Sequence, residues 1–308
     1  MAILKLRVTT PLFVLKGGAV VSGLDAFYKD GRLYLVDPTN PALISRAAAL
    51  EDVVKLASAD PARYAYAAYP APPVPPMAEV KIGTAPPAST IKGILRTAYL
   101  LAVLAKDSKV ASQFLQSVRE ALQERVHPKY AASRGEAIVF RRRFGRRTFD
   151  VFNLVRVKEG ALNANYRVYK MDVVEGGAIK TSIYAVGLAP DSVLEYEIEV
   201  RPFVKESGEK ERWLTEEELK EALDAFAREV ATFERERRGY VACDRGMRLG
   251  FGAGRRWKTV LNFVERQDPT LFGDIERYMS AKLNRVWDDR TVKMAEGKPV
   301  GWVCYEWR

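Results

Sequence analysis

A glycine-rich, basic stretch at residues 248–259 combines the residue types that hold phosphate groups. Three alternating glycines precede three cations: Gly250, Gly252, Gly254, Arg255, Arg256 and Lys258. Glycine adopts positive φ and lets a ligand approach the main chain, while the cations supply charge. The spacing matches neither the dinucleotide G-x-G-x-x-G pattern nor the G-x-x-x-x-G-K-S/T loop. The stretch therefore predicts a phosphate-cradling loop before a helix at 257–264; the alternative is a glycine-rich turn.

A second pair of candidate anion ligands lies on an expected helix at 89–104. Ser89 is its expected cap, and apolar residues at i, i+3 and i+4 form its buried face. Lys92 and Arg96 fall one turn apart on another face. The helix macrodipole opposes positive charge in the first turns by about 0.3–1 kcal/mol, so this placement favours an anion in contact. A solvated helix face is the alternative.

The segment 134–158 carries eight Lys and Arg residues against two acids, with four phenylalanines interleaved. Cations for phosphates and rings for bases are typical of a site for single-stranded nucleic acid. The candidate RNA-binding residues in this thumb-like segment are Arg141, Arg142, Arg143, Arg146 and Arg147.

Composition favours a soluble protein with a polyanionic partner. The 308 residues are 48% hydrophobic, and 49 Lys and Arg against 39 Asp and Glu give a formal charge of +10. No run of 18 or more apolar residues predicts a membrane span, so we expect a cytoplasmic protein without membrane contact. The high charge content with few Asn, Gln and Cys is a thermophile-like bias.

Few residues suited to metal binding or nucleophilic catalysis are present. Cys243 and Cys304 are the only cysteines, neither in a C-x-x-C pair, and His127 is the only histidine. We therefore predict no metal, no cofactor and no catalytic residue. A Cys243–Cys304 disulfide is possible and stays open at this point.

The order of expected elements predicts an α+β fold. A strand at 3–10, a helix at 89–104, strands within 165–204, a helix at 215–237 and a strand at 298–307 give β-α-β-β-α-β. This is the ferredoxin-like (RRM-like) plan, here a palm with large insertions. We expect one domain over 1–308, with insertions at about 12–88, 105–164 and 239–297.

Local signals support two of these elements. Thr215 and Glu218 form a capping box at the start of the second helix. Gly176-Gly177 is a two-residue hairpin signal between two strands, which makes the sheet at least partly antiparallel.

Two motifs resemble the CRISPR RAMP superfamily. Residues 85–96, A-P-P-A-S-T-I-K-G-I-L-R, are similar to its P-G-S-S-I/L-K-G-x-I/L-R element, and residues 248–254 are similar to its glycine-rich loop. The opening residues 10–37 and the closing residues 299–302 are most similar to subunit five of the type III-A Csm effector complex. Lys16-Gly17-Gly18 stands in place of that subunit's H-I-G-x-G.

This resemblance implies a type III ribonucleoprotein subunit in antiviral defence. Such a subunit would bind crRNA, a single-stranded RNA, hold the 3′ part of the guide and cap the backbone filament of the other subunits. It would do so without catalysis.

Two other functions remain open from the sequence. A RAMP endoribonuclease would process crRNA with His127 or Tyr28 as acid or base, or cleave target RNA with a metal at Asp25. A structural subunit that contacts only proteins is the third possibility, and the basic 134–158 segment argues against it.

Overall fold

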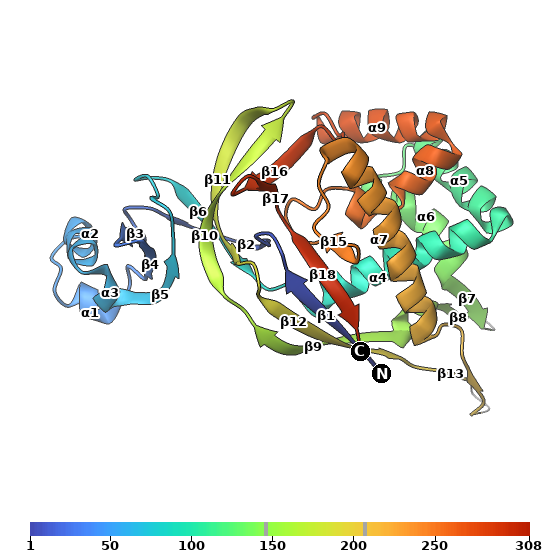
Figure 1. Cartoon of the computed structure of the whole chain (residues 1–308), viewed down its shortest axis with the longest axis horizontal. Coiled ribbons are helices and arrows are strands. Elements are labelled where there is room, and N and C mark those ends of the chain that lie inside the picture. The colour runs from blue at the N-terminus through green and yellow to red at the C-terminus, as the bar shows by residue number, and fades with distance from the viewer. Residues whose placement is uncertain (145–146, 206–207) are drawn as a thin grey trace.

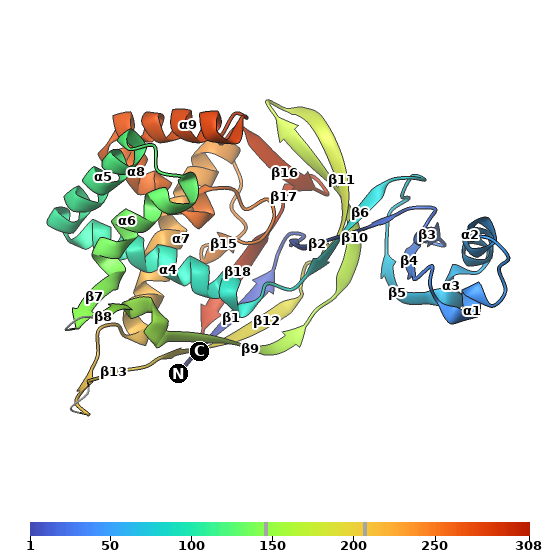
Figure 2. The same cartoon turned by 180° about the vertical axis from the view of Figure 1, so that it is seen from behind.

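A computed structural model describes residues 1–144, 147–205 and 208–308 and shows a mixed α+β protein (Figures 1 and 2). The predicted α+β class is therefore confirmed.

The central sheet has the strand order β15-β18-β1-β12-β9, and all its neighbouring strands are antiparallel. Its strands are β1 (Ala2–Val8), β9 (Val155–Asn163), β12 (Val193–Val200), β15 (Gly246–Arg248) and β18 (Trp302–Trp307). Alternation along β1 places Leu4, Leu6 and Val8 in the main core, while Arg7 is exposed on the other face.

Two long helices, α4 (Ala88–Lys106) and α7 (Glu216–Arg238), pack on the face that carries Leu4 and Leu6. The apolar stripe of α4, from Ile91 to Leu104, is buried in the main core, as the 3.6-residue period requires. By length and composition α4 alone among the described helices could cross a membrane, a property it shares with core helices of soluble proteins.

Capping determines where these helices begin. The main-chain N–H of Glu218 donates to Thr215 Oγ1 at 3.1 Å, and that of Thr215 donates to Glu218 Oε2 at 2.8 Å. The predicted capping box of α7 is therefore confirmed. For α4 the prediction is wrong, because Pro87 is the N-cap and Ser89 lies inside the first turn.

Shorter helices extend this layer, and two small hairpins lie beside it. They are α5 (Ser108–Gln123), α6 (Pro128–Phe140), η1 (Val151–Leu154), η2 (Arg256–Lys258), α8 (Leu261–Gln267), α9 (Pro269–Leu283), β7 (Arg141–Phe144) with β8 (Arg147–Asp150), and β13 (Phe203–Val204) with β14 (Lys210–Glu211).

A second sheet has the order β17-β16-β10-β11-β6-β2 and curves past the central sheet (Figure 1). Its strands are β2 (Val14–Val21), β6 (Glu79–Thr84), β10 (Tyr166–Glu175), β11 (Ala178–Leu188), β16 (Thr291–Ala295) and β17 (Lys298–Pro299). Glu175 pairs with Ala178 across Gly176-Gly177, so the predicted hairpin is confirmed.

This second sheet corrects the expected strand assignment. The strands at 166–188 were expected in the palm but belong to the second sheet, and β9 from the expected insertion at 105–164 takes the place beside β12. In β9 Val155 and Val157 alternate with Arg156 and Lys158. This period-2 pattern lies within the basic segment, where the charges obscured it.

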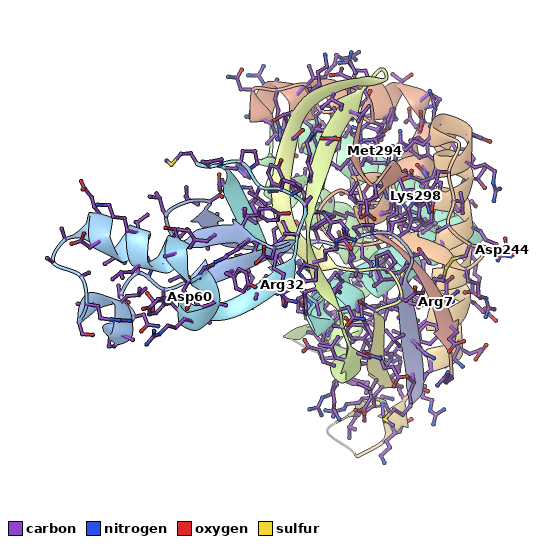
Figure 3. The ribbon with its side chains drawn as sticks, turned by 60° about the vertical axis from the view of Figure 1, so that its left-hand side comes forward. Arg7, Arg32, Asp60, Asp244, Met294 and Lys298 are labelled. Carbon is purple, nitrogen blue, oxygen red and sulfur yellow. A yellow bond between two sulfur atoms is a disulfide. The ribbon has the colours of Figure 1, made fainter. Side chains whose placement is uncertain are left out.

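Residues 22–78 include a small lobe that projects beyond the second sheet, marked by Arg32 and Asp60 in Figure 3. It contains β3 (Ala26–Lys29), β4 (Arg32–Val36), α1 (Pro41–Ile44), α2 (Leu50–Ala59), α3 (Pro61–Tyr64) and β5 (Ala65–Pro70). A separate cluster including Phe27, Leu43 and Tyr64 forms its core.

A disulfide joins Cys243 to Cys304, with the two Cα atoms 6.2 Å apart. It links the segment before β15 to the C-terminal strand β18. The pairing that the sequence left open is therefore present.

Candidate nucleic-acid interface

The two motifs picked out in the sequence meet in one groove. Ser89, Thr90, Gly93 and Thr97 of α4 line a cavity of about 350 Å³ together with Gly250, Ala253 and Lys258. We call this cavity the α4 groove, and residues 249–254 the glycine loop. Segments more than 150 positions apart in the chain thus present hydroxyls, small residues and a lysine to the same space.

Each of the three glycines has a positive φ: +73° at Gly250, +104° at Gly252 and +85° at Gly254. A Cβ on Gly250 would lie 2.1 Å from the carbonyl oxygen of Phe13, which also accepts the N–H of Phe251 at 2.6 Å. The predicted backbone conformation is confirmed, and the close approach of the protein's own main chain explains Gly250. The expected helix at 257–264 begins at Leu261, after the short turn η2.

The buried carboxylate of Glu234 on α7 accepts hydrogen bonds from residues that flank the glycine loop. Glu234 is 1% exposed and accepts from Arg248 Nη1 at 3.0 Å, Arg238 Nη1 at 3.1 Å and Trp257 Nε1 at 3.0 Å. Arg248 also donates to the carbonyl oxygens of Val300 at 3.0 Å and Gly252 at 2.7 Å. Helix α7, strand β15 and both ends of the loop are therefore tied through one ionic network.

Arg255 and Arg256 were expected to bind phosphate, but their side chains are committed to protein carboxylates. Both pair with Asp289 at 2.8 Å, and Arg256 also pairs with Glu265 at 2.7 Å. Their side chains are 8% and 4% exposed. Burial raises the pKa of Asp289, but the hydrogen bonds from the two arginines outweigh it and lower the pKa overall. In this structure both arginines join the segment after the glycine loop to Asp289 through ion pairs.

Arg96 also differs from expectation, because it is held by two acids. It pairs with Glu136 at 3.2 Å and Asp150 at 3.0 Å, and its guanidinium lies 3.8 Å from the ring centroid of Phe140. Lys92, one turn earlier, forms no salt bridge within the described part of the chain. Burial lowers the pKa of Lys92, opposed by Asp150. Lys92 therefore keeps a charge that is not matched by an ion pair.

The basic segment forms the β7–β8 hairpin, on which Arg141, Arg142 and Arg143 are exposed. The backbone of Arg147 lies in β8, its side chain is not described, and Arg146 lies outside the described residues. The hairpin thus supplies positive charge near the end of α6.

The described phenylalanines of this segment do not form the expected base-stacking surface. Phe140 and Phe152 are buried in the main core, and Phe149 packs 5.3 Å from Phe203 and 6.0 Å from Trp213. The rings of Phe140, Phe149 and Phe152 therefore pack within the protein, in the core and between the two small hairpins.

The sequence interpretation missed the hydroxyls of Ser89, Thr90 and Thr97 as groove residues. Thr97 Oγ1 donates to the Gly93 carbonyl at 3.1 Å, which aligns it with the groove wall. The position of Ser89 and Thr90 beside Lys92 in the first motif was the available signal.

No family model and no curated protein matches the chain. Solved structures do match. A chain of a Csm–crRNA–target RNA ternary complex from a type III-A CRISPR-Cas system superposes with a TM-score of 0.73 at 19% identity, covering 99% of this chain and 100% of that one. Csm5 of T. onnurineus gives a TM-score of 0.60 at 17% identity, covering 97% and 99%.

The chain has the Csm5 fold. The resemblance inferred from the two motifs is therefore confirmed for the fold. In this Csm5 fold the α4 groove lies between the first core helix and the glycine loop.

We predict that Glu234→Gln lowers the free energy of unfolding by about 3–5 kcal/mol, because it leaves buried Arg248 without its carboxylate. Chemical denaturation monitored by tryptophan fluorescence measures this. The control is Glu236→Gln on the same helix, which is exposed and should change stability by less than about 0.5 kcal/mol. Equal effects of the two substitutions would contradict a supporting role for Glu234.

Proposed function

We propose that this protein binds the backbone of single-stranded RNA along the α4 groove, as a subunit of a type III CRISPR ribonucleoprotein. The observation that carries the proposal is the convergence of the two motifs on one groove, lined by hydroxyls, glycines and Lys258. The formal charge of +10 supports a polyanionic ligand.

The resemblance and the fold support a more specific role. One structural neighbour comes from a complex that contains crRNA and target RNA. By analogy, this chain would hold the 3′ part of the guide crRNA, contact other Csm subunits, cap the backbone filament and serve antiviral defence in the cytoplasm.

The topology supports a ferredoxin-like palm. The elements β1, α4, β9, β12, α7 and β18 follow β-α-β-β-α-β, and their four strands lie in the antiparallel order β18-β1-β12-β9. We propose one domain in which this palm carries the lobe, the basic hairpin and the 239–297 segment as insertions.

The groove chemistry suits contacts with phosphates and ribose rather than with base edges. Ser89 and Thr90 offer hydroxyls, Lys258 offers an ammonium group, and a Cβ on Gly93 would meet no atom within 4 Å, so this glycine leaves the groove open. Lys92 on α4 and the exposed Arg141–Arg143 of the β7–β8 hairpin lie outside the groove lining and would offer further positive charge to the RNA. Such a surface holds RNA largely independently of its sequence, as a guide-binding subunit requires.

We predict that Lys92→Ala combined with Lys258→Ala weakens binding of single-stranded RNA and reduces its salt dependence. If each lysine contacts one phosphate, the log-log slope of affinity against salt should fall by about 1.4, from roughly 0.7 per phosphate. Fluorescence anisotropy at several salt concentrations measures the slope.

The matched control is Lys55→Ala with Lys109→Ala, which removes the same charge from exposed positions on α2 and α5. An unchanged slope in the Lys92/Lys258 variant, or an equal fall in the control, would contradict the phosphate contacts assigned to these two lysines.

We further propose that the protein is not a nuclease. Asp25, the candidate metal ligand, accepts a hydrogen bond from the main-chain N–H of Val21 and so shapes its own turn. Among the described residues, no group of three or more His, Cys, Asp and Glu is arranged to hold a metal ion. His127, the candidate acid or base, has its ring centroid 6.1 Å from that of Tyr130.

The free protein is expected to leave end-labelled RNA intact with EDTA, Mg²⁺ or Mn²⁺, because the described residues contain no group of three or more His, Cys, Asp and Glu that could hold a metal to activate water. Gel analysis of wild type, Asp25→Ala and His127→Ala tests this, both alone and in the assembled complex. Cleavage by the free wild type that either substitution abolishes would overturn the binding-subunit assignment.

A further inference from the structure

Residues 85–88, A-P-P-A, form the entry to α4 and directly precede Ser89 and Thr90 of the groove. The two prolines of this entry segment have no main-chain N–H, so its two alanines carry its only main-chain donors. No acidic residue lies in the first turn of α4, and the N-cap Pro87 has no side chain that could accept a hydrogen bond. The start of this helix therefore has to be satisfied by groups from elsewhere in the chain.

Two side chains from the sheets accept both main-chain donors of the entry segment. The N–H of Ala85 donates to Tyr166 Oη at 3.1 Å, and the N–H of Ala88 donates to Glu159 Oε1 at 3.0 Å. The carboxylate of Glu159 also lies at the helix N-terminus, where the macrodipole favours a negative charge. Glu159, 71 positions away on β9, thus takes the capping role that the sequence predicted for Ser89.

The hydroxyl of Tyr196 holds a carbonyl group of the same segment. It donates to the carbonyl oxygen of Pro86 at 2.6 Å, and Tyr196 is 2% exposed. Burial raises the pKa of Tyr196, and the neighbouring Glu159 and Tyr166 raise it further, so the hydroxyl stays protonated and remains a donor. Tyr196 and Glu159 are register partners on β12 and β9, whereas Tyr166 lies on β10. The entry segment is therefore held by both large sheets.

This arrangement leaves the hydroxyls of Ser89 and Thr90 without a capping role. Within the described residues, neither hydroxyl forms a hydrogen bond with another protein group. The main-chain N–H of Thr90 donates to the carbonyl oxygen of Pro87 at 2.8 Å, so the first turn of α4 follows the position of the entry segment. A serine that capped its own helix would bond to main-chain N–H groups, whereas Ser89 and Thr90 line the α4 groove.

We propose that Tyr166, Tyr196 and Glu159 are positioning residues for the ligand of the α4 groove. By fixing the entry segment, they keep the hydroxyls of Ser89 and Thr90 at the groove wall and free to contact RNA. Fixing these hydroxyls before the ligand arrives lowers the ordering cost of binding. This inference rests on the proposed function and adds residues that act on the groove through the main chain.

The test substitutes Tyr196→Phe, which removes one hydroxyl and keeps the ring in the core. The matched control is Tyr305→Phe on β18, because Tyr305 is 5% exposed and its hydroxyl donates to Asp224 Oδ1 at 2.7 Å. Both variants lose the hydroxyl hydrogen bond of one buried tyrosine, but only Tyr196 bonds to the entry segment. Tyr166→Phe, at a half-buried position, tests the same segment if Tyr196→Phe fails to fold.

In titrations with single-stranded RNA, Tyr196→Phe should lower the affinity about three- to tenfold, as expected for the loss of one hydrogen bond. The salt slope should stay unchanged, because no phosphate contact is removed. Tyr305→Phe should leave the affinity within about twofold of wild type. In a Ser89→Ala/Thr90→Ala protein, Tyr196→Phe should cause no further loss, since the hydroxyls through which it acts are absent. Additive losses in this double-mutant cycle, or equal losses in Tyr196→Phe and Tyr305→Phe, would overturn the positioning role.

Hydrogen–deuterium exchange of the main-chain amides at 88–91 separates this inference from the proposed function, because it needs no ligand. These amides should exchange faster in Tyr196→Phe than in wild type, and at the wild-type rate in Tyr305→Phe. If this difference is present but wild type binds no RNA, the proposed function is refuted and the hold on the entry segment is supported. RNA binding by Tyr196→Phe at wild-type affinity, or exchange at the wild-type rate, would refute the inference and leave the proposed function intact.

Discussion

The glycine loop depends on the buried carboxylate of Glu234. This carboxylate accepts hydrogen bonds from Arg238, Arg248 and Trp257. Arg248 in turn donates to the carbonyl oxygens of Gly252 and Val300, which fixes their positions. A buried charge network of this kind specifies one geometry because each partner would be costly to leave unpaired. The α4 groove keeps its shape because one wall is fixed by this network and the other is the core helix α4.

The cations of the candidate interface are of two kinds. The arginines Arg96, Arg248, Arg255 and Arg256 are each bound to protein carboxylates, which suits the planar fork of the guanidinium. Within the described part of the chain, Lys92 and Lys258 form no salt bridge. These four arginines are therefore neutralised within the protein, whereas Lys92 and Lys258 are not. This division agrees with a surface whose shape is fixed by ion pairs and whose lysine charges are not neutralised by the protein.

Local signals predicted much of the fold, whereas the charges of the site depended on tertiary contacts. The apolar period of α4, the Thr215–Glu218 capping box and the Gly176-Gly177 hairpin each act over a few residues and were readable. Arg255 and Arg256 find Asp289 more than thirty positions away, so their pairing was not visible in the sequence.

The central claim is that this protein holds a single-stranded guide RNA along the α4 groove. Its most direct test is to isolate the native protein with its complex, release the bound nucleic acid and sequence it, in parallel for wild type and a Lys258→Ala variant, which lacks the ammonium group of the groove. The account predicts CRISPR-derived RNA with defined 3′ ends on the wild type and its depletion from the variant. Wild-type protein that carries no enriched RNA would contradict the account.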